Sequence, residues 1–285
     1  MEKNRSQRVA FGLFWAILFL NGCGKSGDET PLFPADESTT ENLDGPAIFD
    51  LAISAFGGKE AQRVLRSGSV EMKVLGDFPG LSETFDSDTI TFKVQFDLPN
   101  FERREAYGDP ENKRMIFITN SGTLWIGDQN GMGRTMQAPA PDIYPGPLII
   151  GIMQSLIALK ESASKLLLQK DEEDAPYFIV NAYVDDELSS RIYFDKKSHL
   201  PARVEKISYS VHEDSFGLPI QTVTTLSEYK PFGSVTLPTR VTVQQGGVPA
   251  MEVILVQANF NPPQDKSVFA IPELMKNPDS FHDPL

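Results

Sequence analysis

The sequence is poor in the residues that metal and redox chemistry use. It contains one cysteine and three histidines in 285 residues. A lone cysteine cannot form a disulfide within the chain or supply the several thiolates of a zinc site. The histidines, His199, His212 and His282, show neither the His-x-His nor the His-Glu-x-x-His spacing of a metal centre. We therefore expect no metal, no cofactor and a fold that depends on packing alone.

The motifs of common enzyme classes are absent as well. The sequence has no Gly-x-Ser-x-Gly nucleophile elbow and no glycine-rich dinucleotide fingerprint. A calcium-like run at 127–133 has Pro139 where the bidentate acid would stand. The acidic clusters at 171–174 and 185–187 lie in turn-like segments, where carboxylates stay solvated. We expect no catalytic residue and no enzymatic activity, and an enzyme with an unrecognised site is a rival hypothesis.

Positive charge is scarce. The chain has 26 basic and 39 acidic residues, which gives a formal net charge of −13. A surface of this sign repels nucleic acid phosphates and anionic lipid head groups, so it argues against nucleic-acid binding and against a polybasic membrane attachment. Hydrophobic residues make up 40% of the chain, including 19 phenylalanines. This is enough for a substantial core, in one large or two small domains.

The first twenty residues have the order of an export signal, with basic residues followed by an apolar run. Lys3, Arg5 and Arg8 precede an uncharged apolar run at 9–20. Twelve helical residues span about 18 Å, which is short of the bilayer core of about 30 Å, so no permanent transmembrane helix is expected here. The run ends in Leu-Asn-Gly-Cys, with the cysteine at Cys23.

This ending resembles the bacterial lipobox, in which the signal is cut before the cysteine and the cysteine is acylated. Asn21 departs from the small or apolar residue usual at its place. The alternative is an ordinary signal peptide that happens to end in an unmodified Cys23. The resemblance implies a lipoprotein of the bacterial cell envelope, anchored through acylated Cys23 to the outer membrane on its periplasmic side.

Composition divides the rest of the chain. After a signal peptide at 1–22, residues 23–45 are rich in Gly, Pro, Ser, Thr and acidic residues and are predicted to be a flexible, lipidated tether. A random coil of about 22 residues spans on the order of 25 Å, enough to hold a domain clear of the lipid head groups. A single domain is expected at 46–275, followed by a frayed tail at 276–285.

Hydrophobic periodicity predicts an α+β fold. From Pro46 apolar residues recur at helical spacing, with Asp44 as the expected helix cap, and Gly57-Gly58 divides the pattern into two short helices. A third, long helix is predicted at 148–170, after a proline-rich segment. Period-two alternation predicts antiparallel strands at 70–74, 90–96, 101–107, 114–120, 123–127, 177–184, 189–194, 202–211, 220–229, 237–245 and 250–258. The sum is one strongly curved antiparallel sheet with helices on one side of it.

Four segments carry a family resemblance. They are Ala-Phe-Gly-Gly-Lys-Glu-Ala at 55–61, Phe-Asp-Lys-Lys-Ser-His-Leu-Pro-Ala-Arg at 194–203, Tyr-Lys-Pro-Phe-Gly-Ser-Val-Thr-Leu-Pro-Thr-Arg at 229–240 and Val-Phe-Ala-Ile-Pro at 268–272. They are similar to landmarks of bacterial lipoproteins related to the LolA/LolB lipoprotein carriers, over about residues 46–273.

The resemblance implies an unclosed half-barrel, covered by an N-terminal helix and a long central helix, whose apolar concave face binds acyl chains. The lipidated cysteine fits the membrane-anchored acceptor type. The implied partners are the membrane, through Cys23, and the acyl chains of a lipid or lipoprotein. No protein partner is indicated, and because the four segments consist of strand and turn residues they say more about fold than about function.

A half-barrel too wide for its own side chains leaves a cavity that an acyl chain can fill, at about 0.8 kcal/mol for each methylene removed from water. The residues predicted to line it are Phe92, Val94, Phe96, Phe117, Trp125, Ile152, Met153 and Leu156. The alternative is that the same residues form an ordinary closed core. The protein would then be a lipid-anchored scaffold or interaction protein without a ligand.

The anchor is testable by one substitution. Cys23→Ser is expected to move the protein from the membrane to the soluble envelope fraction, because the acyl chains would be attached to the cysteine sulfur. Fractionation of the envelope followed by immunoblotting measures the distribution, with the unaltered chain as the control. Retention of the variant in the membrane fraction contradicts the anchor.

Overall fold

The computed structural model describes residues 43–76, 85, 87–108, 114–138, 148–170, 175–209, 219–263 and 265–272. The predicted signal peptide, Asn21, Cys23, nearly all of the predicted tether and the predicted tail lie outside these residues. The proline-rich segment at 139–147 and the acidic cluster at 171–174 also lie outside them.

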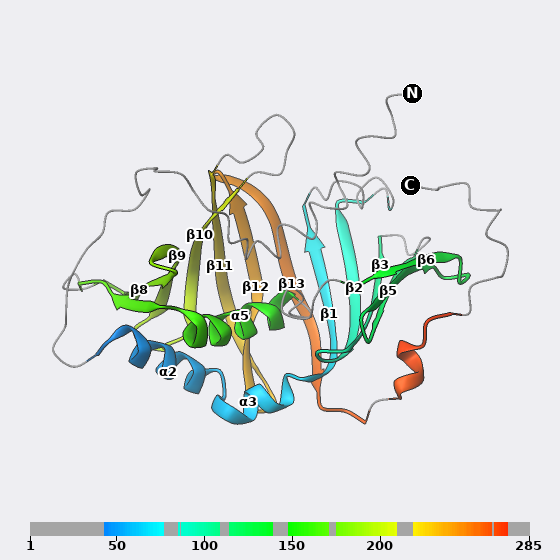
Figure 1. Ribbon diagram of the computed structural model, residues 1–285, viewed down its shortest axis with the longest axis horizontal. Coiled ribbons are helices and arrows are strands. Elements are labelled where there is room, and N and C mark those ends of the chain that lie inside the picture. Colours follow the sequence, from blue (N-terminus) through cyan, green and yellow to red (C-terminus); the bar gives the residue numbers. More distant parts are fainter. Residues whose placement is uncertain are drawn as a thin grey trace.

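One antiparallel sheet of thirteen strands forms the framework of the protein (Figure 1). The strands are β1 (Ser67–Leu75), β2 (Thr89–Asp97), β3 (Phe101–Tyr107), β4 (Arg114–Asn120), β5 (Thr123–Asp128), β6 (Gly133–Gln137), β7 (Lys165–Leu168), β8 (Tyr177–Val184), β9 (Glu187–Asp195), β10 (Pro201–Tyr209), β11 (Pro219–Phe232), β12 (Val235–Gln245) and β13 (Val248–Phe260). β6 and β7 are the two ends of the strand order and do not pair with each other. The predicted α+β fold with an unclosed half-barrel is therefore confirmed.

The sheet consists of two meanders that are joined by a single long-range pairing. Strands β1 to β6 pair with their neighbours in sequence, and so do strands β7 to β13. The two meanders meet where β1 pairs with β13, so that Val70 lies opposite Ala258. We call this pairing the seam.

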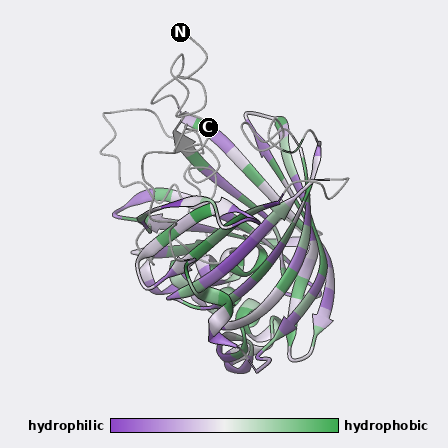
Figure 2. Cartoon of the chain, turned by 90° about the vertical axis from the view of Figure 1, so that its right-hand side faces the viewer, coloured by the Kyte–Doolittle hydropathy of each residue, from purple (hydrophilic) through white to green (hydrophobic). Residues whose placement is uncertain are grey.

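The strands bury alternate residues, as their sequence pattern predicts. In β2, Phe92, Val94 and Phe96 are buried, whereas Lys93 and Gln95 between them are exposed. Successive side chains of a strand point to opposite faces, so one face of the curved sheet is apolar and the other is polar. Figure 2 shows this alternation of hydrophobic and hydrophilic residues along the strands.

The helices lie against one face of the sheet (Figure 1). Among the described residues the α-helices are α2 (Gly45–Ala55), α3 (Gly58–Val64) and α5 (Leu148–Ser162). The predicted cap of the first helix is confirmed, because the Asp44 carboxylate accepts a hydrogen bond of 2.8 Å from the Ala47 backbone N–H. α2 contacts α5, β7 and β8, and Lys160 of α5 forms an ion pair with Asp50 of α2. No helix in the described part of the chain has both the length and the apolar character that spanning a membrane requires.

The prediction of one long helix at 148–170 is wrong in its last third. α5 ends at Ser162, and residues 165–168 form the edge strand β7 instead. Leu168 is buried opposite Val180 of β8, and the Ser164 N–H donates to the Tyr183 carbonyl oxygen over 2.9 Å. Pairing with a neighbouring strand outweighed helix propensity, which is a weak preference of tenths of a kcal/mol per residue. The exposed strand β6 was not predicted, because it has no alternating pattern.

The segments that resemble the carrier family form turns and junctions. In the β9–β10 turn the Asp195 carboxylate accepts hydrogen bonds from the backbone N–H groups of Lys197 and Ser198 and from the Ser198 hydroxyl. These bonds, the Ser198 backbone bond foremost, lower the pKa of Asp195. The segment at 229–240 is the β11–β12 hairpin, where Gly233 has a φ of 65°. The motifs therefore specify how the chain reverses between strands.

The junction between α2 and α3 docks onto the β11–β12 hairpin. The Thr236 N–H donates to the Phe56 carbonyl oxygen over 3.0 Å. At Gly57, where φ is 117°, an added Cβ would overlap the Ser234 carbonyl oxygen, whereas at Gly58, where φ is 63°, an added Cβ would meet nothing within 4 Å. The positive φ favours glycine at both positions, but only at Gly57 does a neighbouring backbone also leave no space for a side chain.

This difference predicts unequal costs for two adjacent substitutions. Gly58→Ala should lower the free energy of unfolding by about 1 kcal/mol, because only the left-handed backbone is penalised. Gly57→Ala should cost about 3 kcal/mol, because the methyl group also pushes the helices off the hairpin. Urea unfolding of both variants beside the unaltered protein measures the two values, and equal losses would contradict the close approach.

Candidate functional site

The apolar concave face brings most of the predicted lining residues together. In the register of the sheet Val94 lies opposite Arg104, which lies opposite Phe117, so these three side chains share one face. Six of the eight predicted residues are buried in a single hydrophobic cluster: Phe92, Val94, Phe96, Phe117, Met153 and Leu156. Ile152 is half-buried and packs against the same cluster. The concave side of the sheet and helix α5 thus meet where the sequence predicted a lining.

The helices supply the other wall of this cluster. Ile149 and Ile150 of α5 are fully buried in it, together with Ile48 of α2. The ring of Phe49 in α2 meets the ring of Phe194 in β9 edge to face, with centroids 5.2 Å apart. The concave face is therefore covered by two separate helices that contact different strands, α2 on β7 and β8 and α5 on β12.

Trp125 does not join the other predicted residues. It belongs to a second cluster with Ile116 and Ile118, against which Ile271 packs. Leu124 and Ile126, its neighbours in β5, belong to the main cluster, so Trp125 points to the convex face. The sequence pattern is ambiguous here because three consecutive residues of β5 are apolar and buried.

Two glycines make room for the Trp125 ring. A Cβ added at Gly127 or at Gly133, which lie opposite each other in β5 and β6, would collide with the indole. The indole is buried, and its Nε1 has no hydrogen-bond partner among the described residues. Trp125 is thus a packing residue of the convex face.

A buried ion pair interrupts the apolar concave face. Glu102 and Arg104 of β3 lie between Phe96 and Val94 of β2 on one side and β4 on the other. Arg104 Nη2 is 2.8 Å from Glu102 Oε1, and the side chains are 9% and 3% exposed. Charges so deeply buried occur in oppositely charged pairs, because the desolvation free energy of a single buried charge would be uncompensated.

The sequence did not single out these two charges, because neither face of β3 is apolar throughout. The convex face of the strand carries Phe101, Arg103, Glu105 and Tyr107, and the concave face carries Glu102, Arg104 and Ala106. Only the register against the strongly alternating strand β2 shows which of the charges face inward.

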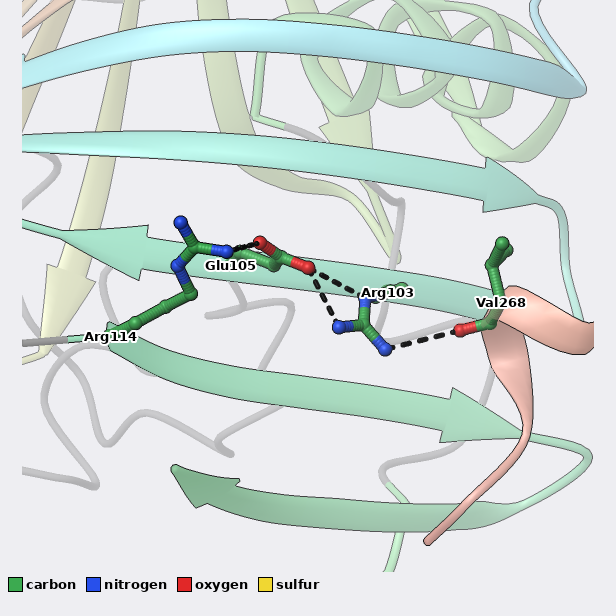
Figure 3. Close-up of polar contacts among 4 residues, drawn as sticks. All are labelled: Arg103, Glu105, Arg114 and Val268. Carbon is green, nitrogen blue, oxygen red and sulfur yellow. Dashed lines mark hydrogen bonds and ion pairs between the residues drawn. The ribbon is translucent and has the colours of Figure 1, made fainter. Parts of the chain in front are cut away.

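On the convex face a second group of charges ties β3 to β4 and to the C-terminal segment (Figure 3). Glu105 accepts a hydrogen bond of 2.8 Å from Arg103 and one of 3.0 Å from Arg114. Arg103 also reaches the Val268 carbonyl oxygen, in the 3-10 helix η2 (Lys266–Phe269). These side chains are partly exposed, so their energetic value is small and their role is to position the segment.

A lysine on the concave face has no such partner. Lys206 of β10 lies opposite Ser190 of β9 and Thr222 of β11, and Val204, two residues earlier on the same face, belongs to the main cluster. No ion pair or hydrogen bond of Lys206 is found among the described residues. Desolvation by burial lowers the pKa of its ammonium group, and no charged side chain of the described residues offsets this effect.

The described residues offer no other chemistry at this face. They contain no group of three or more His, Cys, Asp or Glu side chains placed to hold a metal ion. The loop after Asp128 is a turn, in which the carboxylate accepts from the backbone N–H groups of Asn130 and Met132 over 2.9 Å each. The site is thus an apolar face with one compensated ion pair and one uncompensated ammonium group.

These features define a class of fold, an open antiparallel half-barrel with helices across its concave side. No family model matches the chain, and no curated protein matches it. Among solved structures it is similar to a LolA superfamily protein from Nitrosomonas europaea, with 11% identity and a TM-score of 0.48, over 79% of this chain and 97% of that one. It is also similar to a DUF1329 family protein from Desulfovibrio piger, with 12% identity and a TM-score of 0.42, over the same shares of the two chains.

The buried ion pair predicts strongly non-additive substitutions. Arg104→Met should lower the free energy of unfolding by about 3–5 kcal/mol, because it leaves Glu102 charged and buried. The double substitution Glu102→Leu with Arg104→Met should cost far less than the sum of the single ones, because no charge is then stranded. A double-mutant cycle in urea measures the coupling. Additive losses would show that the two side chains do not depend on each other.

Proposed function

We propose that the domain binds the acyl chain of a lipid or lipoprotein between the concave face of the sheet and the helices α2 and α5. The observation that carries this proposal is the single apolar cluster between an unclosed sheet and two helices that are far apart in sequence. Contacts between apolar side chains and an acyl chain are of the same kind as contacts among the side chains. An acyl chain can therefore replace contacts made by the helices with little net loss of hydrophobic burial. Each methylene of the chain that leaves water contributes about 0.8 kcal/mol to binding.

We propose further that the protein is a non-enzymatic lipoprotein, held through acylated Cys23 at the periplasmic side of the outer membrane. The support is the resemblance of Leu-Asn-Gly-Cys at 20–23 to the lipobox and of the later motifs to LolA/LolB-like carriers. In this role the domain takes part in lipid or lipoprotein transport, or in maintenance of the envelope.

A second candidate function is favoured by the low exposure of the cluster. The six predicted lining residues that belong to the cluster are all less than 10% exposed, which also suits a filled core. The protein would then be a lipid-anchored scaffold whose acidic outer face binds a partner.

Native mass spectrometry separates the two functions. The full chain, purified gently from membranes, is expected to carry lipid at a ratio near one per protein, and after delipidation to rebind hexadecanoate. A preparation that carries no lipid and binds neither hexadecanoate nor hexadecanol contradicts the proposed function.

A substitution that fills the concave face tests the position of the chain. Val94→Trp is expected to leave the protein folded and to weaken hexadecanoate binding by about tenfold, because the indole occupies space that the chain would take. In a filled core the same change would cost about 1–3 kcal/mol through overpacking. Val256→Trp is the matched control, because Val256 is 50% exposed on the same sheet. Unchanged binding by the Val94 variant places the ligand elsewhere.

A further inference from the structure

We propose that the half-barrel selects an anionic amphiphile, whose carboxylate or phosphate head group binds at Lys206 and Ser190 while its acyl chain lies on the apolar concave face. The inference rests on the proposed function and adds the chemical class of the ligand.

The two polar groups are neighbours, and neither has a hydrogen-bond or ion-pair partner in the part of the chain that the structure describes. Ser190 and Lys206 are directly opposite in the β9–β10 register, where Cβ atoms lie about 4.5–5.5 Å apart. Ser190 is 2% exposed, and its hydroxyl makes no hydrogen bond with the described residues. Buried polar groups in folded proteins are nearly always paired, so the open Ser190 hydroxyl is exceptional, and the half-buried Lys206 side chain lies beside it. Together they offer a positive charge and hydrogen-bond donors, which is what an anionic oxygen requires.

The pair is continuous with the apolar cluster. Ile192 and Val204, the next residues on the concave face of β9 and β10, are buried in that cluster, and so is Ala182, which lies opposite Ser190 in β8. An acyl chain on the apolar face therefore has a head-group position beside it, with no intervening polar side chain on these strands.

The position of Lys206 along the sheet also fits a head group. Thr222, which lies opposite Lys206 in β11, is ten residues before Phe232. Phe232 lies at the β11–β12 hairpin, which contacts the α2–α3 junction. Ten strand residues extend about 33 Å, whereas one leaflet of a bilayer core is about 15 Å thick. Thr222 and Thr224 are half-buried, and Leu226, which follows on the same face, is buried. The face thus becomes more enclosed away from Lys206, with ample length for a lipid chain.

The charge of the lysine carries a cost in the absence of a ligand. Burial lowers the pKa of Lys206, which means that its ammonium group loses a proton more readily in the ligand-free protein than the ammonium group of a lysine in water does. An anion in contact would reverse this effect. The chain as a whole has a net charge of −13, so it repels free anions at long range. The ammonium group is therefore suited to an anion that the apolar face already holds, and not to inorganic phosphate.

Paired ligands with the same chain test the inference on the delipidated full-length protein. Hexadecanoate and hexadecyl phosphate are expected to bind at least tenfold more tightly than hexadecanol. Lys206→Met should bring both acids to the affinity of the alcohol and leave the alcohol unchanged, and Lys206→Arg should retain the preference. Ser190→Ala should weaken the acids by a smaller factor. Lys73→Met is the matched control, because Lys73 is exposed on β1 of the same sheet, and it should change nothing.

Each outcome has a separate meaning. Equal affinity for acid and alcohol, in the unaltered protein and in Lys206→Met alike, overturns the head-group inference and leaves acyl binding intact. Failure of all three ligands to bind overturns the proposed function itself. Inorganic phosphate that binds as tightly as hexadecyl phosphate shows a free-anion site and also overturns the inference. In the ligand-free state Lys206→Met should raise Tm, because a desolvated charge is removed, whereas a purely structural lysine would lower it on removal.

Discussion

The apolar face of a sheet that curves without closing must be covered, and the rest of the structure depends on this constraint. A closed barrel would bury its interior against itself, but here β6 and β7 do not pair. The cover is supplied by α2 and α5, which place Phe49, Ile149 and Met153 against the concave strands. The motif around Gly57 and the β11–β12 hairpin matters because it fixes where that cover begins. A cover made of helices, unlike a second sheet, can yield its contacts without breaking any strand pairing.

Much of the fold is encoded in local patterns and was predictable from them. Alternation identified β2 and most other strands, and Asp44 and Pro46 marked the start of α2. The failures share a cause, which is that side-chain direction or pairing depended on residues distant in sequence. β7 became a strand through β8, Trp125 faced outward in a strand that is apolar on both sides, and Glu102 and Arg104 faced inward through the register with β2. The apolar part of the candidate site was therefore predictable, and its polar part was not.

The polar groups of the concave face differ in how their burial is compensated. Glu102 and Arg104 neutralise each other's charge over 2.8 Å through Glu102 Oε1, although Glu102 Oε2 has no hydrogen-bond partner among the described residues. The buried Ser190 hydroxyl and the half-buried Lys206 ammonium group find no partner among the described residues, and their desolvation opposes folding. Residues that destabilise the ligand-free protein are typical of binding sites, because the group that compensates them is the ligand. The contrast between the two pairs explains why only one of them is a candidate for recognition.

The seam between β1 and β13 also decides when the sheet becomes whole. Each meander consists of contacts between sequence neighbours, which form early and cheaply during folding, whereas the seam closes a loop of more than a hundred residues. Without the pairing of β13 to β1 the sheet is divided into two half-sheets with four free strand edges. The apolar concave face spans both halves, so it exists as a continuous surface only after this last strand is in place. Assembly of the candidate site and completion of the fold are consequently one event.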